Sequence, residues 1–222
     1  MSVSRYLIEN HGPNETNIKL AFVEAHRLCK SKGLKSIALM FKNKRQFEMS
    51  DIAKILGEKA KKDLHKGALV NLEGIQLSLV TTNSLSSHHS YEFVLSAYLP
   101  AKDMSKIDGI TSVNSILYLP WTADEGKLWQ ETWKPSVIGV STWEDTSVPL
   151  PTAVQDANLA HTKRINMSTG LSHPSDKQSA IEMIKELQVK VLEFSSEQIP
   201  QFALRNGLYP SYSDELAGLV KD

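Results

Sequence analysis

Polar side chains that could bind a ligand follow several segments predicted to be β-strands. In an open α/β sheet, ligands bind beyond the carboxyl ends of the strands, so the residues just after each strand are the natural candidates. On this basis we expect the ligand to be bound by Lys42, Lys44, Arg45, Thr82, Ser84, Trp121, Thr122 and Ser141.

The types of these residues indicate an anionic or nucleotide-like ligand. The basic side chains within 42–45 would neutralise its charge, and the hydroxyl groups of Thr82 and Ser84 would donate hydrogen bonds to it. Helices predicted to begin at Ser50 and Thr122 would add backbone amide donors, which suit a phosphate or a carboxylate. The plainer alternative, that these are ordinary polar loops, stays open.

Two residues of the same loops could transfer protons, namely His88 and Glu144. His88 lies in the hydroxyl-rich loop 83–90, and a histidine is the natural general base near neutral pH. Paired loop histidines are also common as solvated surface residues. Ser141 follows a predicted strand, as the serine of a nucleophile elbow does, but the second glycine of that motif is missing. The sequence therefore leaves open whether the chain is an enzyme.

Familiar cofactor and metal motifs are missing from the sequence. It contains no GxGxxG dinucleotide fingerprint, no GxxxxGK[ST] phosphate loop, no HExxH and no EF-hand loop. We therefore predict no metal site, and no cofactor can be assigned. The single cysteine, Cys29, falls on the apolar stripe of a predicted helix, where we expect a buried and unreactive thiol.

The fold prediction starts from residues 115–135. An apolar strand ends at Pro120, and Thr122 and Glu125 have the spacing of a capping box that begins a helix. A buried strand followed by a helix is the repeating unit of an α/β domain. We therefore predict a three-layer α/β fold, in which helices flank a mostly parallel or mixed sheet, with a helical C-terminal region.

The remaining elements follow from hydrophobic periodicity and turn signals. Strands are expected at 4–9, 36–41, 75–82, 91–99, 115–119 and 137–140, and helices at 17–32, 50–66, 101–106 and 122–133, with Thr16 or Asn17 as the first helix cap. Glu73-Gly74 could instead be the turn of a hairpin. The loop between 82 and 91 is too short for a helical crossover, which favours antiparallel strands on either side of it.

Two regions are expected along the chain. Residues 1–150 would form the α/β domain, and residues 151–222 a helical region that packs on it without being an independent domain. No signal-peptide pattern and no apolar run long enough for a membrane span is found, so we expect a cytoplasmic protein without a membrane partner.

The formal charge of the 222 residues is zero but unevenly distributed. Residues 1–68 contain 14 Lys/Arg and 7 Asp/Glu, so this part carries a net +7 and the remainder a net −7. The helical spacing of Glu58–Lys62 and Lys59–Asp63 favours a solvated helix face with paired charges. A dedicated nucleic-acid-binding protein normally has net positive charge, so such a partner is not expected.

A second function remains open beside ligand binding. The four tryptophans fall within one short span, at 121, 129, 133 and 143. Together with the C-terminal helices they could form an apolar face for a protein partner or for a second copy of the chain.

Overall fold

The computed structural model describes residues 3–86, 88–110, 112–139, 150–165, 170–189, 197–208 and 210–221. The chain divides into two compact units, Met1–Gln130 with Lys134–Trp143, and Glu131–Trp133 with Glu144–Asp222. The predicted boundary at residue 150, and the packing of the second region on the first, stay predictions.

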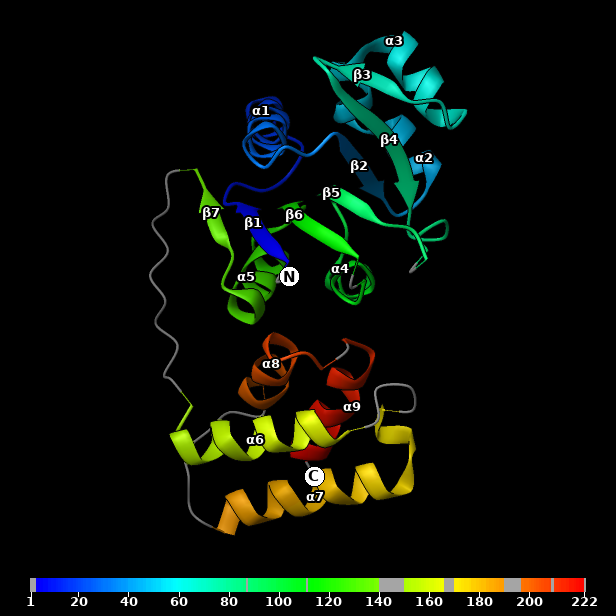
Figure 1. Ribbon diagram of the computed structural model, residues 1–222. Coiled ribbons are helices and arrows are strands. Elements are labelled where there is room, and N and C mark those ends of the chain that lie inside the picture. The colour runs from blue at the N-terminus through cyan, green and yellow to red at the C-terminus, as the bar shows by residue number, and fades with distance from the viewer. Residues whose placement is uncertain are drawn as a thin grey trace. The chain divides into compact units, whose positions relative to one another are not determined.

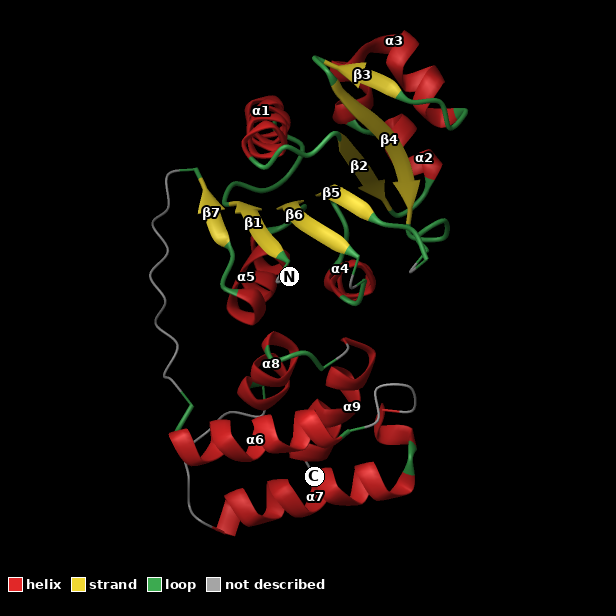
Figure 2. Cartoon of the chain, in the orientation of Figure 1, coloured by secondary structure: helices red, strands yellow, loops and turns green. Residues whose placement is uncertain are grey.

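A seven-stranded sheet forms the first unit, with the strand order β3-β4-β2-β5-β6-β1-β7 (Figure 2). Every neighbouring pair is parallel except β3 and β4, which are antiparallel, and this confirms the predicted mostly parallel sheet. The strands are β1 (Ser4–Ile8), β2 (Ser36–Phe41), β3 (Val70–Leu72), β4 (Ile75–Thr81), β5 (Tyr91–Ala97), β6 (Val113–Leu119) and β7 (Ser136–Ile138).

Helices cover both faces of this sheet (Figure 1). One face carries α1 (Glu15–Ser31), α2 (Lys44–Met49) and α3 (Asp51–His65), and the other carries α4 (Ala101–Asp108) and α5 (Ala123–Trp133). The path from β1 to β2 to β4 moves along the sheet in one direction, and the path from β5 to β6 to β7 moves in the other. Because crossovers between parallel strands are right-handed, the two directions place their helices on opposite faces.

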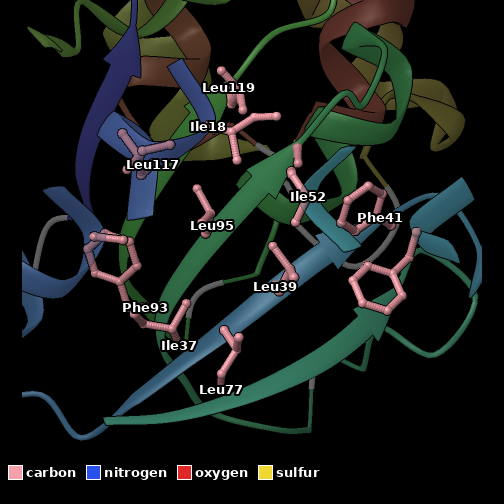
Figure 3. Packing of buried hydrophobic residues seen from close by; sticks show 14 of the residues in the cluster. Ile18, Ile37, Leu39, Phe41, Ile52, Leu77, Phe93, Leu95, Leu117 and Leu119 are labelled. Atoms are coloured by element: carbon pink, nitrogen blue, oxygen red, sulfur yellow. The ribbon is translucent and has the colours of Figure 1, made fainter. Parts of the chain in front are cut away.

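The continuous apolar strands are buried because helices cover both of their sides. Figure 3 shows part of this core, to which Leu39 of β2 and Leu95 of β5 contribute together with Ile18 of α1 and Ile52 of α3. Cys29 is also part of this core and is fully buried, as predicted. Burial raises the pKa of its thiol to about 12.

The connection between β4 and β5 differs from the antiparallel arrangement that its length favoured. Both strands pair with β2 in parallel, so the connection between them returns from the carboxyl edge of the sheet to its amino edge, with no helix among its described residues 82–86 and 88–90. Nine extended residues reach about 30 Å, whereas a seven-residue strand is about 23 Å long. The prediction of antiparallel strands was wrong, because a crossover between parallel strands must be long enough to span the sheet but does not have to contain a helix.

Local signals explain the other differences from the predicted elements. Glu73 and Gly74 both have positive φ, 47° and 92°, and form the hairpin turn between β3 and β4. The first helix is capped by Asn14, whose side chain accepts from the amides of the second and third residues after it, and not by Thr16 or Asn17. Residues after Asn43, expected to be a loop, form the short helix α2 because the Asn43 side chain caps it.

The second unit is a set of helices with an apolar core of its own. The elements are α6 (Thr152–Arg164), the 3-10 turn η1 (Gly170–Ser172), α7 (Pro174–Val189), α8 (Gln198–Arg205) and α9 (Pro210–Lys221). Val154, Ala180, Ile184, Ile199 and Leu216 are among the buried residues that pack together. This confirms the predicted helical C-terminal region. In the parts of the chain described, no helix is long and apolar enough to cross a membrane.

Candidate ligand site at the carboxyl edge of the sheet

Because β2, β4 and β6 run in parallel, three of the four predicted loops begin at one edge of the sheet. These are residues 42–45 after β2, residues 82–84 after β4 and residues 121–124 after β6. The fourth loop, with Ser141 and Glu144, lies outside the described residues.

A continuous line of contacts runs along this edge. The Thr82 hydroxyl donates to the Lys42 carbonyl oxygen at 3.0 Å, and the Lys42 amide donates to Gln46 Oε1 at 3.0 Å. The other end of the Gln46 side chain, Nε2, donates to the Tyr98 carbonyl oxygen at 3.2 Å. The Tyr98 ring meets the Trp121 ring edge to face, with 5.1 Å between the centroids. We call these five residues the edge site.

The edge site crosses a topological switch point. The chain leaves β2 toward α2 on one face of the sheet and leaves the neighbouring β5 toward α4 on the other face. Such a point is where open α/β sheets bind ligands, because the two connections diverge there. The Gln46 side chain bridges the exits of these two strands. A second switch point, between β6 and β1, is joined by a backbone hydrogen bond from Gly12 to Pro120 at 3.1 Å.

Tyr98 has an uncommon backbone conformation and an unpaired hydroxyl group. Its φ is +59°, and its amide donates to the Leu119 carbonyl oxygen at 2.9 Å. The side chain is 5% exposed, and its hydroxyl has no hydrogen-bond partner among the residues described. Burial, with a smaller effect of Asp51, raises the pKa of Tyr98 to about 12, so the hydroxyl keeps its proton. Left-handed backbone at an aromatic residue costs about 1–3 kcal/mol and is concentrated at functional sites.

The β2 exit contributes positive charge to this edge of the sheet. Lys42 and Arg45 are exposed, and within the described ranges their side chains have no ion pair or hydrogen bond. Lys44 differs from them because its ammonium group donates to the His65 carbonyl oxygen at the end of α3, at 2.7 Å. Lys42 and Arg45 are therefore two cations of the β2 exit that are available to a ligand.

The side chains of Thr122 and Glu125 cap the start of α5. The predicted capping box is confirmed: Thr122 Oγ1 accepts from the Glu125 amide at 3.3 Å, and Glu125 Oε2 accepts from the Trp121 and Thr122 amides. Asp124 adds a second negative charge to the first turn. An anionic group is therefore better placed toward Lys42 than at this helix end.

Two residues predicted to bind the ligand or to transfer protons, Ser84 and His88, are not part of the edge site. Ser84 completes the turn after β4, where its hydroxyl donates to the Thr81 carbonyl oxygen at 3.2 Å. His88 is exposed and lies near the opposite, amino edge, because the next residue, His89, accepts from the Ser112 hydroxyl just before β6 at 2.7 Å. The structure therefore does not bring His88 together with Lys42. Ser50 caps α3, as predicted, and accepts from an amide of its first turn.

Gln46 and Tyr98 have no signal in the sequence that singles them out. Gln46 belongs to the short helix α2, whose first residues were expected to be a loop, and Tyr98 ends an apolar run that was expected to continue as a strand. Only the topology shows that one side-chain amide joins the two strand exits.

The tryptophans are distributed between core and surface. Trp129 is 4% exposed, donates to Asp108 Oδ2 at 2.8 Å and packs against Tyr118. Trp121 is 48% exposed, and Trp143 lies outside the described residues. Trp129 is therefore a core residue and not part of an exposed face. Docking of a protein partner or of a second copy of the chain stays a prediction.

Metal-ligating side chains do not converge in the described part of the chain, where no group of three or more His, Cys, Asp or Glu residues could hold a metal ion.

Comparison with known proteins adds information on the second unit alone. Residues 150–222 match the family DUF1889, a domain of unknown function. The match covers one third of the chain and leaves the sheet with the edge site outside it. Neither the curated proteins nor the solved structures contain a match to this chain.

Proposed function

We propose that the first unit binds a small anionic ligand with a planar, nucleotide-like group at the edge site. The observation that supports this proposal is the line of contacts from Thr82 to Trp121 across the switch point between β2 and β5. It joins the exits of four neighbouring parallel strands, where α/β proteins bind ligands.

The distribution of charge suggests how the ligand lies. Its phosphate or carboxylate would face Lys42 and Arg45, since the first turn of α5 already contains two carboxylates. Its planar group would stack on the half-exposed Trp121. The β2 and β6 exits are separated by two strand spacings, about 10 Å. A ligand must span this distance to contact both ends.

Thermal unfolding with a panel of nucleotides and phosphorylated metabolites tests the proposal. A ligand at 100 times its dissociation constant stabilises the folded state by about 2.7 kcal/mol, which raises the midpoint by about 5–10 °C for a chain of this size. The shift should be lost in Arg45→Ala and Lys42→Ala. Lys30→Ala, which removes an exposed cation from the last turn of α1, is the matched control and should retain it.

Two further variants separate the roles of the aromatic residues. Trp121→Phe should abolish ligand-dependent quenching of the exposed tryptophan while weakening binding modestly. Tyr98→Phe removes a buried hydroxyl that has no partner in the described structure, so it should leave the fold as stable as before or stabilise it by about 1 kcal/mol. A panel without any shift, for a protein that unfolds cooperatively, would contradict the proposed function.

A further inference from the structure

The lysines on the second half of α3 are not paired as their spacing suggested. Glu58 contacts Lys61 at 3.5 Å, and neither the Glu58–Lys62 nor the Lys59–Asp63 pair is formed. Lys59, Lys62 and Lys66 are exposed, and their side chains have no ionic or hydrogen-bonding partner in the described parts of the chain.

These three lysines share one side of the helix. They lie at positions i, i+3 and i+7, which fall on one helix face, and Leu64 between them points the other way into the core, where it is fully buried. We call Lys59, Lys62 and Lys66 the lysine row. With a rise of 1.5 Å per residue, it extends over about 10 Å.

The fold adds a second basic segment beside the row. Lys44 Nζ lies 2.7 Å from the His65 carbonyl oxygen, and His65 Nδ1 lies 2.8 Å from Glu48 Oε1, so the start of α2 is next to the end of α3. Lys44 and Lys66 are about twenty residues apart in the sequence, and the fold places Lys44 beside the end of α3, directly before Lys66. They explain where part of the net +7 of residues 1–68 is concentrated.

We propose that the lysine row binds the phosphate backbone of a nucleic acid. A single small anion cannot contact three cations spread over about 10 Å, whereas a chain of phosphates presents repeated charges over that length. Lysine suits this contact because it is a point charge that neutralises a phosphate without requiring a fixed geometry. The proposal does not rest on the edge site, since the row contains none of its residues.

Fluorescence anisotropy with a labelled DNA duplex and labelled single-stranded DNA and RNA of random sequence tests the proposal. Three phosphate contacts give a slope of about −2.7 for log affinity against log salt on duplex DNA, so affinity should fall about 40-fold between 50 and 200 mM salt. Lys59→Glu/Lys62→Glu/Lys66→Glu should reduce affinity at 50 mM salt by more than tenfold. The control Lys102→Glu/Lys163→Glu/Lys185→Glu makes the same charge change at exposed helical lysines elsewhere and should retain binding.

Three results would overturn the proposal. They are no binding at 50 mM salt, an equal loss in both triple variants, and equally tight binding of polyglutamate or of anionic vesicles. If the charge-reversed row fails to fold by circular dichroism, Lys59→Gln/Lys62→Gln/Lys66→Gln replaces it, with glutamine at the control positions. The small-ligand thermal shift, measured on the row variant, should persist. A loss of this thermal shift in the row variant would count against the proposed function and not against nucleic-acid binding by the row.

Discussion

Asp108 connects three elements of the first unit through a single buried carboxylate. Its Oδ1 lies 2.9 Å from Arg5 Nε of β1, and its Oδ2 accepts from Trp129 Nε1 of α5 at 2.8 Å. The Asp108 side chain is 2% exposed and that of Arg5 is 12% exposed. Asp108→Asn keeps the shape of the side chain and removes its charge, so it isolates the electrostatic contribution.

The expected cost follows from the burial of both partners. Removing one member of a buried ion pair destabilises a protein by about 3–5 kcal/mol, because the remaining charge stays in a poorly solvated position. The amide can still accept from Trp129 through its oxygen, so that hydrogen bond adds little to the cost. Replacing both charges, in Arg5→Met/Asp108→Leu, should cost less than the sum of the single variants, because neither charge of this pair remains.

Urea unfolding followed by circular dichroism measures this effect. With a slope of about 2 kcal/mol per M urea, Asp108→Asn should lower the midpoint by about 1.5–2.5 M. Lys102→Gln changes an exposed residue of the same helix and should leave the midpoint nearly unchanged. A shift below about 0.5 M for Asp108→Asn, or full additivity in the double variant, would refute the account of this buried pair.

Three other properties are open to direct measurement. Cys29 should not react with a thiol reagent in the native protein but should react fully in urea, because burial raises the pKa of its thiol to about 12. Hydrogen bonds at the start of β2 hold the pKa of Glu92 below 4.5. The contribution of this carboxylate to the free energy of unfolding is therefore present above about pH 4.5 and is lost as the pH falls further. Glu92→Gln should cost about 1 kcal/mol at neutral pH, and Glu58→Gln is the exposed control. Burial lowers the pKa of His161 below 6.5, so the second unit should lose stability below about pH 6.5. His161→Leu should remove this loss, whereas His173→Gln should not.

The architecture could be predicted because its signals are local. The apolar run that became β6, the Thr122–Glu125 capping box and the buried stripe with Cys29 each depend on a few neighbouring residues, and each is found in the structure. The direction of β5 could not be predicted in this way. It depends on how β5 pairs with β2, which lies about fifty residues earlier in the chain.

The candidate site was predictable in part for the same reason. Polar residues after strands can be recognised in a sequence, so Lys42, Thr82 and Trp121 were expected, and the parallel sheet places them on one edge. The contacts that join them depend on strand order. Gln46 can bridge to Tyr98 only because β2 and β5 are neighbours, and this neighbourhood is a property of the whole sheet.

The most direct test of the edge site is an NMR titration of the uniformly ¹⁵N-labelled protein with a ligand that raises the unfolding midpoint. The changes in the chemical shifts of the backbone amides are recorded. If the proposal is right, the shifts concentrate at residues 42–46 and at Thr82, Tyr98 and Trp121, and they disappear in Arg45→Ala. Shifts confined to the amino edge around His88, or to the helices of the second unit, would contradict it.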